Sequence, residues 1–592
     1  MRRILPIIFV LAVIAGLFFV SKIDAKEKIL IDPHLDLQDQ LSRGGVTYVI
    51  DSDVDLAGKE INLPLNCMLD FEGGSIRNGI IKGSVNNDYL CPEWFGAKGD
   101  GVSDDTEPIR QCISMSKKVK LQGKTYCIKS RNVHDVFLVD HDLEIDGSGA
   151  TLVLPDELYV DYNSSIWLFH NDESKDVKND YFHDFNIDVR VTKTPDFKGN
   201  FYMFNLFSEN IRISNVNVKN NGKYNNLNAF TICYAKDVEI RNCNVENESL
   251  SSIGGILWVM MKDRPAGGRT HISLKDCQFI HDAKDETVCF SSSQVNKTDC
   301  DIKFEVSDCV FTSPNNVKGS GFIILYDNRD GGDAMYNYRI DGRVENCKFL
   351  SKRNADKSDT DRRVLAIQRS GNTRASWNVE FDNCEFYDAS SYSHVNGDNN
   401  KWSCNYLFGL PSYKVGKDNS YSIKIIRSKI KTNNSVFNAY TGGTAADIVM
   451  DGCEVECKAL RLSNANSDLN VANVKVHKCM IKTEFPYSFG GNEIWSDSEI
   501  TSSYDFFLVP FSKKLNLKKQ FNKCSVNGSS LRVDVKNGEK EMHVKKYCTW
   551  SHPIYNQKTE TIDGILATDA FPRNANISKD LIIKGSLNVS KK

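Results

Sequence analysis

The sequence predicts an all-β protein built as a parallel β-helix, in which short strands stack coil upon coil. Two observations carry the prediction: apolar and polar residues alternate along much of the chain, and a cysteine recurs in the same local context at uneven spacings. Alternation with a period of two indicates strands rather than helices. Uneven spacing indicates fixed strands joined by connections of variable length, whereas the blades of a propeller would recur more evenly.

Ten positions anchor this repeat, at spacings of 25 to 45 residues. They are Val216, Cys243, Cys277, Cys309, Cys347, Cys384, Ser428, Cys453, Cys479 and Cys524. A second family of apolar strands begins near residues 229, 255, 287, 321, 364 and 436. Because stacked coils hold the anchor side chains parallel, we expect free buried thiols rather than disulfide bonds.

Composition narrows the function classes. The 592 residues are 41% apolar and 26% charged, which is ordinary globular usage and excludes wholesale disorder. Lys and Arg total 74 and Asp and Glu total 77, so the net charge of -3 gives no basic footprint for nucleic acid. We therefore expect no nucleic-acid partner.

Residues 1–25 have the features of a bacterial-type secretory signal. Arg2 and Arg3 precede an apolar run of 17 residues that ends at Val20, and Ala25 offers a small residue for cleavage. An uncleaved anchor is the alternative, since 17 residues is close to the shortest membrane span. We expect a secreted, periplasmic or cell-surface bacterial protein with no stable membrane span after cleavage.

Residues 26–92 are predicted to form a β-rich accessory or cap region. Turn signals separate its short apolar runs at Gly44-Gly45, Gly73-Gly74 and Asn78-Gly79. The repeat predicts the β-helix itself at residues 93–500. Residues 501–592 lose the period and are predicted to form a C-terminal cap or a small β module.

Residues 93–113 read EWFGAKGDGVSDDTEPIRQCI. This stretch resembles the F-G-A-x-G-D-G-x-x-D-D-T signature that opens many pectate-lyase-like β-helix proteins, among them polygalacturonase-like hydrolases, glucanases and phage tailspike depolymerases. The segments that begin at Lys120 and Leu143 resemble the next two strand pairs of that family. The resemblance implies a right-handed single-chain β-helix and a polysaccharide as the partner.

A helix that caps the N-terminal end of the solenoid is expected within the signature. Ser103 or Asp104 can cap its start, and Ile109, Cys112 and Ile113 share one apolar face. The open end of a solenoid needs such a cover. A metal site made by the aspartates of the signature is the alternative interpretation.

The polygalacturonase family carries its catalytic acids in N-T-D, D-D, G-H-G and R-I-K motifs, and this sequence departs from all four. Residues 226–230 read NLNAF where N-T-D-G-F would stand. Residues 251–255 read SSIGG near the D-D place, and residues 284–286 read KDE near the G-H-G place. No catalytic residue of that family therefore carries over.

Candidate catalytic residues come instead from the long connections between residues 243 and 428, which are expected to build binding walls on a rigid solenoid. A hydrolase needs two carboxyl groups, ~5–5.5 Å apart for retention or ~6.5–9.5 Å apart for inversion. A lyase needs a base, with cationic groups or Ca²⁺ to hold a uronate carboxylate. The candidates are Asp285, Glu286, Asp327, Arg329, Arg362 and Arg363.

Aromatic residues of the same coils suit the apolar C–H faces of sugar rings. The predicted substrate contacts are Trp258, Tyr326, Tyr336, Arg369, Tyr392 and Trp402. Ordinary packing of aromatics and solvation of charged loop residues are the alternative for each of them.

Together these features predict an exported enzyme that degrades an acidic polysaccharide, as a glycoside hydrolase or a polysaccharide lyase. A non-catalytic glycan-binding or surface-adhesion solenoid is the alternative, favoured by the missing catalytic motifs. We expect no metal site and no cofactor, with Ca²⁺ as the exception if the reaction is an elimination. The protein is expected to be a monomer or a trimer.

Overall fold

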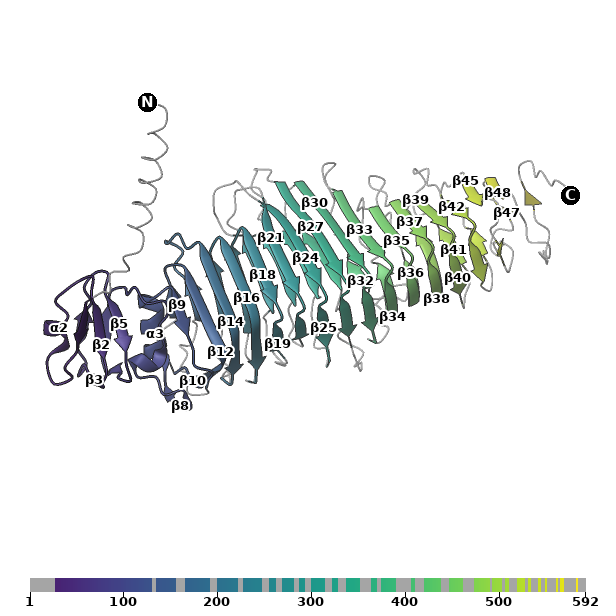
Figure 1. Ribbon diagram of the computed structural model, residues 1–592. Coiled ribbons are helices and arrows are strands. Elements are labelled where there is room, and N and C mark those ends of the chain that lie inside the picture. The colour runs from purple at the N-terminus through teal and green to yellow at the C-terminus, as the bar shows by residue number, and fades with distance from the viewer. Residues whose placement is uncertain are drawn as a thin grey trace, which may run out of the picture. The chain divides into compact units, whose positions relative to one another are not determined.

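The computed structural model describes the chain from Glu27 to Ile583 apart from short gaps (Figure 1). The gaps are residues 130–134, 156–164, 192–199, 222–226, 248–254, 262–268, 282–286, 293–299, 315–321, 328–336, 352–363, 370–373, 390–405, 410–419, 438–446, 462–472, 490–491, 503–505, 510–518, 528–530, 534–540, 545–548, 551–560, 563–564 and 569–581. The predicted signal at residues 1–25 lies outside the described residues. Among those described, no helix has the length and apolarity needed to cross a bilayer.

The described residues form two compact units. The first comprises the residues up to Lys98 together with Glu107–Lys120, and the second comprises Gly99–Thr106 together with the residues from Leu121 on. The first unit contains β1 (Lys28–Leu30), α2 (Leu37–Gln40), β2 (Thr47–Ile50), β3 (Val54–Asp55), β4 (Glu60–Asn62), β5 (Met68–Phe71), β6 (Ile76–Arg77), β7 (Ile80–Lys82), the 3₁₀ helix η1 (Pro92–Phe95), most of α3 (Thr106–Met115) and β9 (Lys118–Lys120).

The first unit is itself a short parallel solenoid. β2 and β5 pair in parallel with Thr47 opposite Met68. Two shorter parallel pairs, β3 with β6 and β4 with β7, follow the same coil. Gly45, Gly73 and Asn78, which stand at the predicted turns, have positive φ. The alternation of short strands and turns in the sequence thus corresponds to coils rather than hairpins.

The helix expected in the signature stretch is α3. Asp104 Oδ1 accepts a hydrogen bond from Thr106 N at 3.0 Å, at the start of this helix. Asp105, which is fully buried, accepts one from Gly99 N at 3.2 Å. The aspartates of the signature therefore hold backbone turns. The capping of the solenoid by α3 stays a prediction.

In the second unit a full coil has three strands, and strands of each kind stack in parallel (Figure 1). The unit begins with β8 (Asp100–Asp104) and β10 (Thr125–Cys127). Sheet 1 contains β11 (Asp135–Val139), β13 (Ile166–Asn171), β15 (Phe201–Phe207), β17 (Leu227–Tyr234), β20 (Leu257–Met261), β23 (Val288–Ser292), β26 (Ile323–Asp327), β29 (Leu365–Arg369), β32 (Tyr406–Gly409), β41 (Phe506–Val509) and β44 (Leu531–Val533). The structure confirms the predicted right-handed parallel β-helix.

Sheets 2 and 3 follow sheet 1 in each coil, and β12 (Leu143–Leu154), β14 (Asn179–Val189) and β16 (Asn210–Asn220) run through both. Sheet 2 continues with β18 (Asp237–Arg241), β21 (Thr270–Lys275), β24 (Cys300–Ser307), β27 (Asn337–Glu345), β30 (Arg374–Asp382), β33 (Ser420–Ile426), β35 (Asp447–Asp451), β37 (Asn473–His477), β39 (Asn492–Ser496), β42 (Lys519–Asn522), β45 (Glu541–Val544) and β48 (Ile565–Thr568). Sheet 3 continues with β19 (Asn244–Asn247), β22 (Gln278–His281), β25 (Val310–Ser313), β28 (Lys348–Ser351), β31 (Glu385–Asp388), β34 (Lys429–Phe437), β36 (Glu454–Arg461), β38 (Met480–Phe489), β40 (Glu499–Ser502), β43 (Ser525–Asn527) and β46 (Thr549–Trp550). The C-terminal parts of β34, β36 and β38 continue into sheet 1, where they lie between β32 and β41.

Parallel pairing of strands continues beyond residue 500. The sequence predicts the start of a C-terminal cap or small β module at this point, because the repeat is no longer visible there. β42 pairs with β45, and β45 pairs with β48 up to Thr568. A separate pair joins β47 (Thr561–Ile562) to β49 (Ile582–Ile583). Coils therefore continue past residue 500, first at the Cys524 anchor and then where the sequence shows no anchor.

One residue with positive φ marks the bend between sheets 2 and 3, directly before each anchor. Asn242, at φ 52°, precedes Cys243, and Asp276, at φ 54°, precedes Cys277. Asn and Asp tolerate left-handed backbone better than other residues with a side chain. The bend thus explains why the repeat reads N-C or D-C. The full series is Asn215, Asn242, Asp276, Asp308, Asn346, Asn383, Arg427, Gly452, Lys478, Asp497 and Lys523.

This series contains an anchor that the sequence comparison missed. Ser498 is 3% exposed and follows Asp497, whose φ is 49°. The 45 residues between Cys479 and Cys524 therefore hold two coils rather than one long insertion. The D-S pair at this place resembles the R-S pair that ends in Ser428, so the signal was present.

The core of the second unit consists of like side chains stacked on one another. The rings of Phe311 and Phe349 stack with centroids 4.8 Å apart, and those of Phe349 and Phe386 with centroids 5.3 Å apart. Burying each such ring contributes ~1.5–3 kcal/mol. The predicted free thiols are confirmed at Cys243, Cys277, Cys309, Cys347, Cys384, Cys453 and Cys479, all at most 2% exposed.

Candidate functional site

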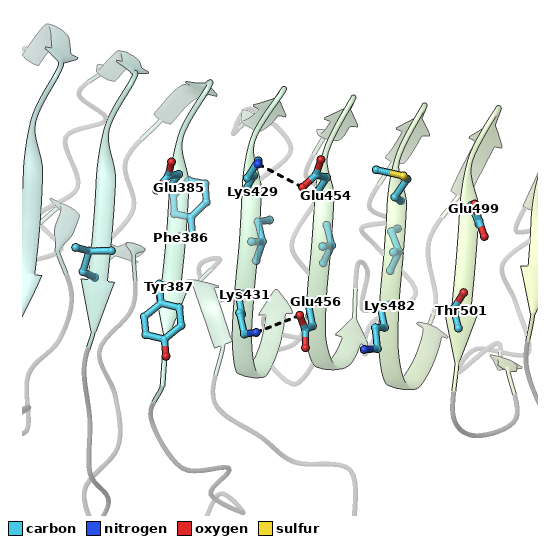
Figure 2. Close-up of a pocket in the computed structure, with 15 residues that line it drawn as sticks. Glu385, Phe386, Tyr387, Lys429, Lys431, Glu454, Glu456, Lys482, Glu499 and Thr501 are labelled. Atoms are coloured by element: carbon cyan, nitrogen blue, oxygen red, sulfur yellow. Dashed lines mark hydrogen bonds and ion pairs between the residues drawn. The ribbon is translucent and has the colours of Figure 1, made fainter.

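A hollow of about 520 Å³ lies on the outer face of sheet 3, over β28, β31, β34, β36, β38 and β40 (Figure 2). We call it the sheet-3 groove. It is lined by Leu350, Glu385, Phe386, Tyr387, Lys429, Ile430, Lys431, Glu454, Val455, Glu456, Met480, Ile481, Lys482, Glu499 and Thr501. Because these residues lie on regular strands, the groove is carried by a rigid element of the fold.

Strand alternation decides which residues reach the groove. On β36, Val455 is 3% exposed and points into the core, whereas Glu454 and Glu456 are exposed. Parallel register then aligns the outer residues of successive strands. The first column is Glu385, Lys429, Glu454, Met480 and Glu499, and the second is Tyr387, Lys431, Glu456, Lys482 and Thr501.

Two ion pairs join β34 to β36 in the middle of the groove (Figure 2). Lys429 Nζ lies 3.6 Å from Glu454 Oε2, and Lys431 Nζ lies 3.3 Å from Glu456 Oε2. All four side chains are more than half exposed. Exposed pairs of this kind contribute ~0–1 kcal/mol. They can therefore be exchanged for contacts to a ligand at little cost.

The two ends of the groove differ from its middle. Tyr387, at 40% exposure, presents an aromatic ring on β31. Met480, at 56% exposure, and Lys482 stand at the other end on β38, and Glu499 follows on β40. Within the described part of the chain, neither Lys482 nor Glu499 takes part in an ion pair. An aromatic face and a free cation are therefore presented at opposite ends.

A smaller hollow of about 250 Å³ lies on sheet 2, over β24, β27, β30 and β33. Its charged lining residues are Lys303, Asp341, Arg343, Glu380 and Lys424. Partial burial raises the pKa of Asp341, but hydrogen bonds from Asn378 and Arg269 outweigh it and hold that pKa below its usual value. Asp341 is thus an ionised carboxylate whose oxygens already accept hydrogen bonds from neighbouring side chains.

A mixed polar cluster stands on the outer face of β12 and β14. His183 Nδ1 lies 2.7 Å from Asp184 Oδ2, and His183 Nε2 lies 3.3 Å from Glu144 Oε1. The hydrogen bond from His183 lowers the pKa of Asp184. One ligand atom each of Asp146, His183 and Asp184 lies within 4.8 Å of the others, so among the described residues this set could hold a metal ion.

Most of the predicted catalytic residues fall outside the described residues: Asp285, Glu286, Arg329, Arg362 and Arg363. The backbone of the sixth, Asp327, ends β26 and pairs with Arg369 at the end of β29. The structure therefore brings one predicted catalytic residue and one predicted binding residue to neighbouring positions on sheet 1.

Of the other predicted substrate contacts, Tyr336, Tyr392 and Trp402 lie outside the described residues. The backbone of Tyr326 lies on β26, one residue before Asp327. Trp258 stands on β20 between two fully buried neighbours and is itself partly exposed, so it lies on the outer face of sheet 1. Its Nε1 has no hydrogen-bond partner among the described residues.

The residues of the sheet-3 groove were not singled out from the sequence. A usable signal exists, because they stand one and three places after an anchor. The segments C-E-V-E, C-M-I-K and S-K-I-K, which begin at Cys453, Cys479 and Ser428, show it directly. Their polar positions read as ordinary solvated residues until the register places them side by side.

Comparison with known proteins found a curated relative that matches part of the chain, and no family model matches the sequence. The relative is a capsule K30/K69-specific depolymerase of Klebsiella phage K64-1, 25% identical over 256 residues. The match covers 41% of this chain and 26% of the relative, so the chain spans about a quarter of the relative's length.

Solved structures similar to this chain include an adhesin and two enzymes. PfbA, a surface adhesin of Streptococcus pneumoniae, matches 79% of this chain and 93% of its own at 12% identity and a TM-score of 0.31. The match to the catalytic unit of a GH87 α-1,3-glucanase from Streptomyces thermodiastaticus covers 75% of this chain and 68% of that unit, at 14% identity and a TM-score of 0.35. The match to the A-module of the mannuronan C-5 epimerase AlgE6 of Azotobacter vinelandii covers 78% of this chain and 99% of that module, at 10% identity and a TM-score of 0.29.

Proposed function

We propose that this protein is an exported bacterial depolymerase that binds a polysaccharide along the sheet-3 groove and cleaves it. The observation that carries the proposal is the groove itself, where an exposed aromatic ring and two columns of polar side chains share one rigid face. Aromatic faces pack on sugar rings while polar groups meet the hydroxyls. The printed activity of the phage relative, a capsule-specific depolymerase, supports a polysaccharide as the ligand.

Cleavage is proposed to occur in the central coils on the side of sheet 1. Asp327 and Arg369 pair at the ends of β26 and β29, so a carboxylate and a guanidinium originate on neighbouring strands. A carboxylate can act as a general acid or base, and a guanidinium can hold a uronate carboxylate. Asp285, Glu286, Arg329, Arg362 and Arg363 complete the proposed catalytic set.

Binding without cleavage is the second candidate function. The groove's own carboxylates favour it, because Glu454 and Glu456 each face a lysine and neither is set apart as a proton donor. A protein with this groove alone would bind a glycan without cleaving it.

Incubation of the purified protein with neutral and acidic polysaccharides tests both functions. New reducing ends indicate cleavage, and added absorbance of an unsaturated uronate distinguishes elimination from hydrolysis. Glu286→Gln and Arg363→Ala should then abolish cleavage while binding persists. Loss of activity in EDTA and its recovery with Ca²⁺ would support the elimination. Binding with no products from any polymer would leave only the adhesin-like function.

A further inference from the structure

We propose that the sheet-3 groove recognises a glycan whose repeat carries few acidic groups, with the chain lying across the strands along the solenoid axis. The inference rests on the proposed function, since it names the substrate class of that same groove. The arginines of the central coils suggest an acidic glycan. The groove limits this class further, to glycans in which most sugars are uncharged.

The direction of the bound chain follows from the columns. β31 and β40 have four residues each, so each presents only two outward side chains along its own length. Across the strands, by contrast, each column continues from β31 to β40. Neighbouring strands lie ~4.8 Å apart, so Tyr387 and Lys482, three strands apart in one column, are separated by ~14 Å along the axis. A stretch of several sugars spans that distance.

The charge of the groove opposes a densely acidic chain. Its lining contains four glutamates and three lysines. Two of the lysines, Lys429 and Lys431, already face Glu454 and Glu456. A polymer with a carboxylate on every sugar would have to displace these glutamates, and its charges would then lie beside two unpaired carboxylates. Like charges at such separations repel, and the repulsion suppresses the wrong partner.

Uncharged sugars meet no such obstacle. Their hydroxyls can donate to Glu454 and Glu456 and accept from Lys429 and Lys431 without adding charge. Because exposed ion pairs contribute little, this exchange is nearly neutral in free energy. The middle of the groove is therefore suited to neutral sugars.

Lys482 supplies the place for a single acidic group. It is exposed, it lies in no ion pair within the described residues, and its column neighbour Thr501 offers a hydroxyl. Tyr387 stands at the far end of the same column, where a neutral sugar can stack on its ring. The groove thus fits a repeat in which one acidic sugar follows several neutral ones.

Binding of the full-length protein to three classes of polymer tests this inference. The probes are dextran as a neutral polymer, polygalacturonate as a uniformly acidic one, and a panel of bacterial exopolysaccharides with one uronate per repeat, including deacylated gellan. We expect the tightest ligand among the sparsely acidic polymers. Lys482→Gln should weaken that binding roughly tenfold and leave binding of neutral polymers unchanged.

Lys475→Gln is the matched control, because Lys475 is an exposed lysine of the same coil on sheet 2. It should bind as the wild type does. The double variant Glu454→Gln, Glu456→Gln should gain affinity for polygalacturonate, a result that misfolding cannot produce. Tightest binding of polygalacturonate by the wild type, or equal effects of the two lysine variants, would overturn the inference while leaving the proposed function standing. If the protein bound none of these polymers, both the inference and the proposed function would be wrong.

Discussion

Asn383 donates a hydrogen bond from Nδ2 to Asn346 Oδ1 at 2.7 Å, across two neighbouring coils and at the bend between sheets 2 and 3. Both residues have positive φ, 52° for Asn383 and 55° for Asn346. The same side-chain type thus tolerates the backbone of the bend and links one bend to the next. Asn346 Nδ2 continues the chain of hydrogen bonds to Asp308 Oδ1 at 3.2 Å.

Replacing Asn383 separates these two contributions. Asn383→Gly loses the hydrogen bond, worth ~0.5–1.5 kcal/mol, but keeps a residue suited to positive φ. Asn383→Ala loses the hydrogen bond and adds ~1–2 kcal/mol of backbone strain. We expect the thermal midpoint to fall in the order wild type, Gly, Ala, as followed by circular dichroism. A Gly variant as unstable as the Ala variant would show that the backbone of the bend is not the cause.

The bend also explains how far the fold could be predicted from the sequence. Each coil needs one residue that accepts positive φ and, directly after it, a buried side chain, so D-C or N-C recurs at five of the bends, while G-C, K-C, R-S and D-S pairs stand at others. Ser498 was missed because the strand before it, β39, breaks the apolar alternation: Glu493 is buried and Ile494 is exposed. The coils after Cys524 were missed because their strands lack a repeated cysteine: β46 contains Thr549 and Trp550.

The site was harder to predict because it is assembled by register. Tyr387 and Lys431 are 44 residues apart in the sequence, whereas Lys431 and Glu456 are 25 apart, yet all three share one column. Connections of such unequal length hide the neighbour relations. The charges that the sequence did single out belong mainly to these connections, and the groove residues belong to the strands.

A half-buried glycine on β27, Gly342, gives a second stability prediction. The ring of Phe304 occupies the space where Gly342 would carry a Cβ, and the same ring stacks on Phe290 with centroids 4.5 Å apart. Gly342→Ala forces this ring to move within a packed core, at a cost of ~1–3 kcal/mol. We expect a lower thermal midpoint, and Phe304→Leu in the same chain should restore part of it. Strictly additive effects of the two substitutions would contradict the proposed overlap.

Because the stacked thiols are free, we expect reductants to leave the stability of the folded protein unchanged. Cys347 and Cys384 are free and 1% exposed, and burial raises the pKa of Cys384 to about 12. A buried, protonated thiol is a poor nucleophile. We expect no change of the thermal midpoint with dithiothreitol, and no reaction of these two cysteines with an aromatic disulfide reagent until the protein unfolds. Labelling of either residue in the native protein, located by mass spectrometry, would contradict this.

Asp180 gives a pH dependence. It is 1% exposed on β14, and its Oδ2 accepts hydrogen bonds from Ser208 Oγ at 2.5 Å and Asn171 Nδ2 at 3.0 Å. Burial raises the pKa of Asp180 to about 6 from 3.8. The folded protein therefore binds this proton more tightly than the unfolded chain does. The stabilisation is complete below pH ~4 and is lost as the pH rises through ~6, by up to ~3 kcal/mol.

Asp180→Asn mimics the protonated form and removes this loss. We expect the thermal midpoint of the wild type to fall more steeply between pH 4 and pH 7 than that of the variant, so that the variant gains relative stability at neutral pH. Asp88→Asn, which changes an exposed carboxylate of the first unit, serves as the control. Parallel curves for wild type and Asp180→Asn would show that Asp180 is ionised at little cost.

Tyr387 provides the most direct test of the sheet-3 groove. Its ring is 40% exposed and stands beside Lys431 in the second column, so its removal should leave the core untouched. Tyr387→Ala removes a stacking surface worth ~0.5–1.5 kcal/mol beyond its area, which corresponds to an affinity loss of about two- to tenfold. Tyr387→Phe keeps the ring and should retain most of the affinity. Calorimetric titration with the tightest-binding polymer measures both, and thermal midpoints within a degree or so of the wild type would show that folding is unaffected. Equal binding by the wild type and the Ala variant would place the glycan elsewhere on the solenoid.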